Sequence, residues 1–550
     1  MTTKRGLKDR IADGEVDLQL STDVLVIGGS LSGLWAAISA VQAGARVIVA
    51  EKGYAGTAGP IAAGSVGSYF IRPDDPAHRD VMVNARMPLA FGLADSRWGE
   101  IILDQAYKNM LAMAQWGYKW PTTADGRQRP GGITPNVLIF LRRKAEALGV
   151  RFLDHCPVLE LLLSDGQAAG AVGVNRKNGE GWSVRAGAVI VATGGTAFLS
   201  GAAGTGGLTG DGYLLGAEAG AEFSGMEFTS QFHIVPSRGA LSKGAYRGSW
   251  STLTDNNGKT ITLGRQTVKA ILETGAAWDK FDQESDPELQ KLIFSSNYVS
   301  TQFFDDAGID PFKEKYQVDF ICEGSIRATG GLDIDDRLST RVPGLFASGD
   351  VTSREKLNGA GPPGGGPAAA WAQGAGYLAG QSAAAFARRL GSSAADRKVE
   401  GAGAAGLRPL RTRRDDIVVK DVVGAVQEHM LALDKNYWRD GVSLKASLVR
   451  FGHLWTELRE GLAGADGADP RAEARSVLRA REVAALLAAA RWMNSSALER
   501  SETRGLHRRS DFPNLDPNQT HHLISGGVDQ IWVKRRAVDP NALIKEAAAA

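Results

Sequence analysis

The sequence predicts an α/β fold built on a Rossmann-like unit, and residues 24–52 carry most of that prediction. An apolar run at 24–27 is typical of a strand buried on both faces, and small and apolar residues at helical spacing follow a Gly-rich turn. A second buried strand, 46–50, runs into Glu51. The later run 188–195 is expected to return to the same parallel sheet, and 342–350 predicts a further strand and turn.

The Gly-rich turn predicts a dinucleotide site. Gly28, Gly29, Ser30 and Gly33 precede and open the predicted helix, so backbone N–H groups and the helix dipole can approach a pyrophosphate closely. Glu51 can accept hydrogen bonds from ribose hydroxyls and would repel a 2′-phosphate, which argues against NADP. Because Ser30 replaces the middle glycine of G-x-G-x-x-G, an ordinary tight strand–helix turn is the competing interpretation.

Composition bounds the classes of function. A chain of 550 residues exceeds one hydrophobic core, which predicts two to four domains, and 43% hydrophobic with 23% charged residues is typical of a soluble globular protein. The net charge of +2 predicts no broad attraction to nucleic acid or anionic membranes. No apolar run is long enough to span a bilayer, and 1–20 lacks a signal-peptide pattern, so we expect a cytoplasmic protein.

The two cysteines, Cys156 and Cys322, are too few for a disulfide framework or a four-cysteine iron–sulfur cluster. They are also far apart, without a C-x-x-C pair, which disfavours a disulfide reductase. The eight histidines show no metal-ligand spacing, and no metal site is predicted. Any iron–sulfur relay must therefore belong to another chain.

The order of the segments predicts an inserted domain. The predicted nucleotide-binding domain has two parts, 1–233 and 336–392, separated by an α+β capping domain at 234–335, where the strand–helix–strand pattern is lost. Within the first part, Asp165-Gly166 and Asn178-Gly179 predict the hairpin turns of a β-meander. A linker at 393–415, a helical domain at 416–510 and a mixed C-terminal segment at 511–550 are expected to follow.

Seven motifs, in order, resemble the flavoprotein subunits of fumarate reductase and succinate dehydrogenase, a lineage that includes L-aspartate oxidase and the alpha subunit of adenylylsulfate reductase. They are VLVIGGSLSGLWAA, VIVATGG, TGDGYLLGAEAGA, MEFTSQFH, LGRQTVKAI, VPGLFASGD and ETRGLHRRSDFP, and they span Val24 to Pro513. The resemblance implies an FAD-dependent oxidoreductase that transfers hydride between flavin N5 and a substrate carbon. It also implies a Rossmann-like FAD-binding domain with a capping domain and a C-terminal helical domain.

The resemblance implies that FAD lies in an extended groove, with pyrophosphate on the Gly turn, ribose on Glu51, flavin along 57–64 and the ribityl chain near Asp350. A helix expected to begin at Pro367 would direct its positive end at flavin O2. The respiratory members carry a covalent flavin on a histidine, but TAGPIAAG contains none, so non-covalent FAD is predicted. The implied cofactor residues are Gly28, Gly29, Ser30, Ser32, Gly33, Glu51, Lys52, Thr57, Ala63, Gly64, Ala192, Thr193, Gly194, Asp211, Gly349, Asp350, Gly365 and Gly366.

Three residues match catalytic positions of the family. Arg265 falls where an arginine shuttles the proton, and its fixed fork of donors can also hold an anion. His233 matches a substrate-binding histidine, and Arg247 is a weaker candidate in a segment resembling an Arg-Gly turn. Without the resemblance, a solvated arginine and a satisfied core histidine are the simpler interpretations.

Two expected substrate groups are missing. Ile326, with Arg327 beside it, occupies the position of a histidine in the dicarboxylate enzymes, and Pro362 occupies that of an arginine. Losing both would remove charge-assisted hydrogen bonds of about 1.5–3 kcal/mol each, which disfavours fumarate and succinate as substrates. The aromatic residues nearby leave room for a larger or less charged small molecule, unless they are core residues: Phe228, Phe232, Tyr246 and Trp250.

Three hypotheses follow. The leading one is a flavoprotein that exchanges electrons with a separate iron–sulfur, ferredoxin-like subunit, with adenylylsulfate reductase as the functional analogue. The second is a stand-alone dehydrogenase or oxidase using oxygen or a quinone. The third is a flavin-bearing subunit of a larger complex that has lost catalysis. The reaction direction and the oligomeric state stay open.

Overall fold

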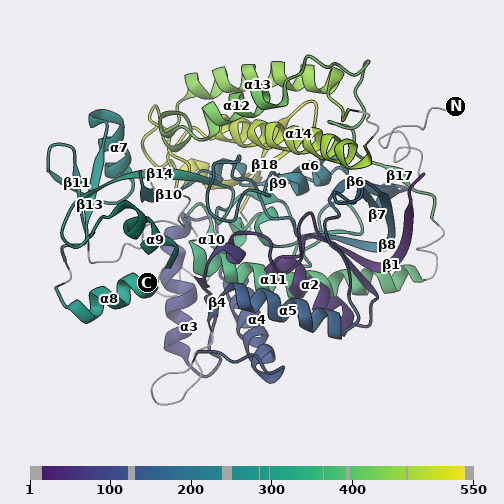
Figure 1. Cartoon of the computed structure of the whole chain (residues 1–550), viewed down its shortest axis with the longest axis horizontal. Coiled ribbons are helices and arrows are strands. Elements are labelled where there is room, and N and C mark those ends of the chain that lie inside the picture. Colours follow the sequence, from purple (N-terminus) through teal and green to yellow (C-terminus); the bar gives the residue numbers. More distant parts are fainter. Residues whose placement is uncertain are drawn as a thin grey trace.

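The protein is represented by a computed structural model that describes most of the chain (Figure 1). The described residues are 15–121, 131–237, 251–283, 285–296, 298–362, 364–391, 397–465 and 469–538.

A mixed sheet forms the centre of the nucleotide-binding domain, as the α/β prediction requires. Its strands follow the order β17-β6-β7-β8-β1-β2-β5, and β16 also pairs with β8. Strands β1, β2, β5, β8 and β16 run parallel, whereas β6, β7 and β17 are antiparallel additions. The bounds are β1 Leu18–Ile27, β2 Val47–Ala50, β5 Arg151–Leu153, β6 Val158–Ser164, β7 Gln167–Val174, β8 Gly181–Val191, β16 Leu345–Ala347 and β17 Glu400–Gly401.

The β-meander forms through the predicted turns. Asp165 and Gly166 both have positive φ, 48° and 72°, as a two-residue hairpin between β6 and β7 demands. Strand β8 then pairs with β7 at its start and with β16 at its end, where Val189 lies opposite Leu345. The meander thus branches from the parallel sheet without interrupting β1.

Helices cover both faces of this sheet (Figure 1). On one face α11 packs against α2, and glycines permit close contact: a Cβ on Gly380 would lie 2.2 Å from the Ala36 carbonyl oxygen. Helix α11 begins at Gly365, two residues before Pro367, where the sequence predicted its start. Pro367 is tolerated within the first turn because an N–H at that position would have no helical partner. The bounds are α2 Leu31–Gln42, α4 Ser96–Gln115, α5 Pro135–Ala147, α6 Asp211–Glu218, α10 Glu355–Asn358 and α11 Gly365–Leu390.

A separate antiparallel sheet, in the order β10-β14-β13-β11-β12, forms the α+β capping domain at the left of Figure 1. Its own apolar core includes Ile234, Phe281 and Tyr316. Strand β14 leads from this sheet toward the main body. The predicted domain boundary at 234 falls within β10, another strand of the same sheet. The bounds are β10 Gln231–Pro236, β11 Thr252–Asp255, β12 Thr260–Ile261, β13 Ala277–Lys280, β14 Tyr316–Gly324, α7 Arg265–Thr274, α8 Pro287–Ser296 and α9 Tyr298–Ala307.

The C-terminal part returns to the nucleotide-binding domain. Helices α12 (Val419–Met430) and α13 (Gly441–Gly461) pack on α14 (Pro470–Glu499), which contacts α6. A third, four-stranded sheet then joins distant segments in the order β15-β9-β18-β19. Those strands are β9 Phe223–Ser224, β15 Gly331–Leu332, β18 His521–Gly526 and β19 Trp532–Ala537. Within the predicted linker, Arg408 pairs with the buried Glu160 at 2.6 Å.

Short elements complete the described chain. They are β3 Val66–Gly67, β4 Gly132–Ile133, α3 Pro76–Val83, the 3-10 helices η1 Pro60–Ala63, η2 Asn84–Ala90, η3 Met226–Phe228, η4 Gly349–Val351 and η7 Pro517–Gln519, and the π-helix η6 Leu433–Tyr437.

A buried ionic network fastens the C-terminal part to η3. Arg500 donates to Glu227 and to Glu502, each at 2.9 Å, and all three side chains are fully buried. Arg504 donates to Glu502 at 2.6 Å, and Arg500 also lies over the ring of Phe228. Phe228 is therefore a core residue. Charges removed from water are tolerated only when paired in this way.

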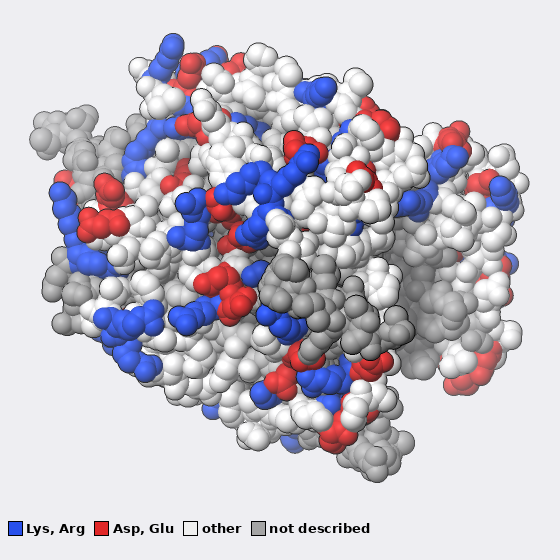
Figure 2. All heavy atoms as spheres, turned by 180° about the vertical axis from the view of Figure 1, so that it is seen from behind, with Lys and Arg blue, Asp and Glu red and all other residues white. Residues whose placement is uncertain are grey.

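The surface carries both signs of charge. Figure 2 shows Lys and Arg beside Asp and Glu over most of the face seen from behind, as the small net charge leads one to expect. Among the described residues, none of the helices combines the length and apolar character needed to cross a bilayer.

Removing Arg500 tests the network. Arg500→Met leaves the buried Glu227 carboxylate without its cation, and we expect a loss of about 3–5 kcal/mol in the free energy of unfolding measured with urea. The double variant with Glu227→Met should recover part of that loss. The control Arg535→Ala removes an exposed partner of Glu499 and should cost about 0–1 kcal/mol. Equal losses for Arg500→Met and the control would contradict the account.

Candidate functional site

A cavity of about 830 Å³ lies along the carboxyl ends of the parallel strands. Such an edge is where ligands bind in open α/β sheets. The cavity is lined by the turn after β1, the residues after β2 and β8, the loop 57–63, the turn 326–327, and the start of α11.

The Gly turn after β1 leaves no space for side chains. A Cβ on Gly28, whose φ is +106°, would lie 2.4 Å from the Ala192 carbonyl oxygen. A Cβ on Gly33 would lie 1.8 Å from the Gly28 carbonyl oxygen, so Gly33 sets the approach of α2. The hydroxyl of Ser30 donates to the Ala58 carbonyl at 2.8 Å, and no side chain caps the start of α2. The positive end of the helix therefore faces the cavity, which suits a pyrophosphate.

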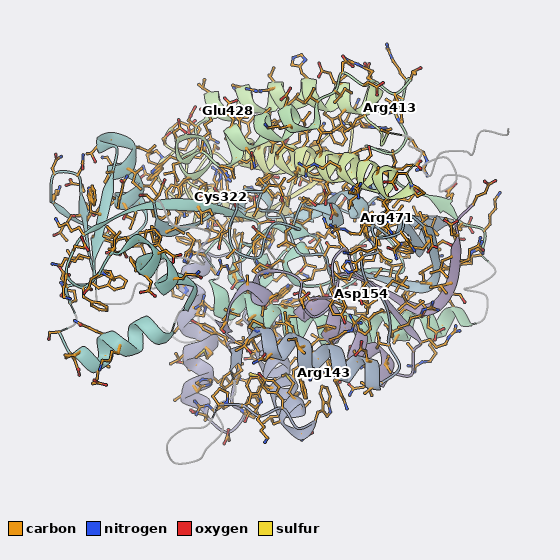
Figure 3. The ribbon with its side chains drawn as sticks, viewed as in Figure 1. Arg143, Asp154, Cys322, Arg413, Glu428 and Arg471 are labelled. Atoms are coloured by element: carbon orange, nitrogen blue, oxygen red, sulfur yellow. The ribbon has the colours of Figure 1, made fainter. Side chains whose placement is uncertain are left out.

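One end of the cavity is built around Glu51. Its buried carboxylate accepts hydrogen bonds from the backbone N–H groups of Gly29 and Gly53, each at 2.7 Å. The carboxylate is thus fixed beside the Gly turn, where its remaining lone pairs can accept ribose hydroxyls. Figure 3 labels Asp154, which braces the same region by accepting from the backbone N–H of Ala55.

Lys52 joins the nucleotide-binding domain to α14 at this end. Its ammonium lies 2.6 Å from Asp211 and 3.0 Å from Glu482, and it donates to the hydroxyl of Thr209. Burial opposes the charge, but Asp211 and Glu482 outweigh it and raise the pKa of Lys52. A lysine kept charged in this way balances two carboxylates beside the cavity.

The other end of the cavity is formed by the turn 326–327, η4 and α11. Asp350 lines this end, and its carboxylate accepts a hydrogen bond from the backbone N–H of Arg327 at 3.4 Å. Gly349 lies against Ser32, since a Cβ there would be 2.9 Å from the Cβ of Ser32. The N-cap Gly364 has φ +70° and no side chain caps α11, so a second positive helix end faces the cavity.

Every predicted cofactor residue lines the cavity except Gly33, Gly64 and Gly366. Gly33 and Gly366 act in packing, because a Cβ on Gly366 would meet the ring of Tyr69 at 2.4 Å. Which of the lining residues touch the cofactor stays a prediction.

Of the predicted catalytic residues, Arg265 and His233 are not among the residues that line this cavity, and Arg247 lies outside the described residues. Arg265 begins α7, is exposed, and has its guanidinium 5.8 Å from the ring of Trp438. His233 lies half-buried on β10, where burial and the charge of Arg327 lower its pKa to about 4, so it is neutral near pH 7. Arg247 lies outside the described residues, as do Tyr246 and Trp250. The roles of Arg265, His233 and Arg247 stay predictions.

Sequence patterns missed several residues of the cavity wall. Glu482 comes from α14, 430 residues after Lys52, and no local motif marks it. Tyr54, His155 and Arg176 line the Glu51 end together. Hydrogen bonds link two of them to that end: the backbone N–H of His155 donates to the Gly53 carbonyl, and Arg176 donates to the Lys52 carbonyl. Only the pairing of β2 with β5 brings His155 to this place.

Two family models match this chain. One, described as an FAD binding domain, matches residues 23–367, and the other, described as the C-terminal part of fumarate reductase flavoprotein, matches 437–546. The chain belongs to the fumarate reductase flavoprotein family. It is an FAD-dependent oxidoreductase of the succinate dehydrogenase/fumarate reductase type, and the predicted cofactor class and fold are confirmed.

Named relatives span almost the whole chain. L-aspartate oxidase of Mycobacterium tuberculosis is 28% identical over 92% of this chain and 96% of its own. The fumarate reductase flavoprotein of Haemophilus influenzae is 26% identical over 92% of this chain and 92% of its own. At these identities the relatives leave the substrate of this chain open.

Solved structures share the fold. A chain of E. coli quinol fumarate reductase superimposes with a TM-score of 0.79 at 21% identity, covering 95% of this chain and 97% of that chain. Adenylylsulfate reductase from Archaeoglobus fulgidus gives 0.74 at 18% identity, covering 95% and 97%.

The cavity fits FAD. Its glycine cradle admits a pyrophosphate where any Cβ would collide, Glu51 offers carboxylate oxygens to a ribose, and two uncapped helix ends supply positive potential. When bound, FAD supplies hydride chemistry at N5. The chain's own residues hold the dinucleotide and line the space beside its ring system.

Replacing Glu51 tests the ribose site. Glu51→Ala removes the ribose acceptor and leaves the N–H groups of Gly29 and Gly53 unpaired, so we expect the Kd for FAD to rise at least about tenfold, equivalent to about 1.4 kcal/mol. Fluorescence titration of apoprotein measures it. Glu146→Ala, which removes a half-exposed carboxylate paired with Arg142 outside the cavity lining, is the control. An unchanged Kd for Glu51→Ala would count against the assignment.

Proposed function

We propose that this flavoprotein transfers hydride between FAD N5 and a small organic substrate other than fumarate or succinate, and exchanges electrons with a separate iron–sulfur, ferredoxin-like protein. The bound FAD is non-covalent. The observation that carries the proposal is the character of the cavity end opposite Glu51.

This end of the cavity is poor in groups for two carboxylates. Ile326, an apolar and fully buried residue, is among the residues that line this end. Pro362 is exposed where the dicarboxylate enzymes of the resemblance have an arginine. Within the described lining, Arg327 is the one arginine here, and its guanidinium contacts Glu323. A second substrate carboxylate would lose charge-assisted hydrogen bonds of about 1.5–3 kcal/mol each. These features favour a substrate with less negative charge.

The cysteines support an external electron partner. Cys156 and Cys322 are both buried and unpaired, and Figure 3 labels Cys322 on β14. Burial, chiefly, raises the pKa of each thiol to about 12, which leaves neither as a thiolate near pH 7. The described residues also contain no cluster of metal-ligating side chains. Electrons leaving FAD therefore need an acceptor beyond these groups.

Non-covalent attachment is supported by the loop 57–64, which contains no histidine. Among the described residues that line the cavity, His155 is the one histidine, and it lies at the Glu51 end. That end would hold the adenosine ribose, so His155 is remote from the flavin ring.

Reoxidation of the reduced protein tests the proposal. After anaerobic photoreduction, an oxidised ferredoxin-type protein should reoxidise the flavin, whereas fumarate should reoxidise it no faster than buffer because two carboxylate-binding groups are missing. Stopped-flow absorbance measures both. The double variant Ile326→His/Pro362→Arg should increase the fumarate rate at least about tenfold, since one charge-assisted hydrogen bond exceeds about 1.4 kcal/mol.

Fast reoxidation of the wild type by fumarate would refute the substrate part of the proposal. Fast reoxidation by air, without exchange with ferredoxin, would refute the partner and favour a stand-alone oxidase.

A further inference from the structure

The turn 324–328 carries the capping sheet into the cavity. Strand β14 ends at Gly324, and the Ser325 hydroxyl then accepts from the backbone N–H of Thr196 at 2.9 Å. The next two residues, Ile326 and Arg327, line the cavity. The position of Arg327 thus depends on both domains.

The backbone of Arg327 is held in an unfavourable conformation. Its φ is +56°, in the left-handed region that residues with a Cβ rarely adopt. Two contacts hold it there: its N–H donates to Asp350 on η4, and the neighbouring Ala328 carbonyl accepts from the buried Arg354. Such strain persists only where surrounding structure fixes it, and it gathers at functional sites.

Arg327 lines the cavity, whereas its partner Glu323 does not, so the cation of this pair is the charge nearer to the cavity. The Arg327 guanidinium contacts one oxygen of Glu323, a residue 3% exposed at the end of β14. The second oxygen of Glu323 has no hydrogen-bond partner among the described protein atoms. Burial, chiefly, and the nearby Arg354 lower the pKa of Arg327, while Asp350 opposes this. A buried cation in such a place keeps part of its potential directed at the cavity.

The position of this charge relative to FAD follows from the two ends of the cavity. Pyrophosphate separates the two ring systems of FAD, and Glu51 takes the adenosine ribose. The flavin must then lie toward the opposite end, which Arg327 lines.

We propose that Arg327, held by Glu323, is the cation that stabilises negative charge at the flavin end of the cavity, so that this pair sets the reduction potential of the bound FAD. The proposal depends on FAD occupying the cavity and not on the identity of the substrate. Glu323, paired with Arg327, lowers the positive potential that the arginine exerts on the flavin.

Opposite charge changes give opposite shifts of the flavin midpoint potential. Arg327→Gln removes the cation and should make reduction less favourable by at least about tenfold, or about 30 mV for two electrons. Glu323→Gln removes the moderating anion and should shift the potential upward. Arg327→Lys keeps the charge and should stay near the wild type. The potential is measured by slow enzymatic reduction beside a reference dye, with no substrate present.

The matched control is Arg176→Gln, which removes the same charge from the Glu51 end of the same cavity and should leave the potential unchanged. An unchanged or raised potential for Arg327→Gln, or an equal fall for Arg176→Gln, would overturn the proposal. If Arg327→Gln binds no FAD, the variants Glu323→Gln and Arg327→Lys decide. An upward shift of the midpoint potential in Glu323→Gln, with none in Arg327→Lys, supports the proposal. An unchanged potential in Glu323→Gln overturns it.

Discussion

The close approach of α2 to the strand ends is the constraint on which the rest of this molecule depends. Gly33 lies directly over the Gly28 carbonyl, and Gly28 lies against Ala192 at the end of β8, with no space for a Cβ at either contact. This contact brings the helix N-terminus to the edge where β1, β2 and β8 end. A pyrophosphate placed there fixes the directions in which the two halves of FAD must extend, and so fixes which residues can act on the flavin.

Two connections between distant segments turn this nucleotide-binding unit into a redox site. At one end Lys52 links the unit to Glu482 of α14, so the C-terminal helices complete the cavity wall. At the other end β14 delivers Arg327 from the capping sheet to Asp350. Because both ends are built from separate parts of the chain, the environment of FAD depends on assembly of the whole fold, including the buried Arg500–Glu227 pair.

Local sequence predicted the features that local sequence controls. The Gly turn, Glu51 and the Asp165-Gly166 hairpin each depend on a few neighbouring residues whose backbone demands are specific, and each was predicted from the sequence. Family resemblance supplied Asp350 and the start of α11, within two residues. Glu482 was missed because its place beside Lys52 is set by helix packing across 430 residues. The strained conformation of Arg327 was also beyond the sequence, because an arginine with positive φ has no local signature.

The predicted catalytic residues show the same division. The predicted domain bounds placed Arg265 in the capping domain and His233 at the last residue before it, whereas His233 lies on β10 of the capping sheet. The distance from either residue to the flavin depends on how that domain meets the cavity. Position along the chain carries no information about that distance. The predicted loss of charged groups at 326 and 362 is different, since it rests on comparing motif positions with the family and not on how the domains meet.

The measurement that tests the central claim most directly is purification of the protein from its native cells without added cofactor, followed by an absorbance spectrum and identification of each co-purifying chain. The account predicts flavin bands that acid releases completely into the supernatant, together with broad iron–sulfur absorbance from a smaller second chain. The absence of flavin, even after incubation with FAD, would contradict the account at its foundation.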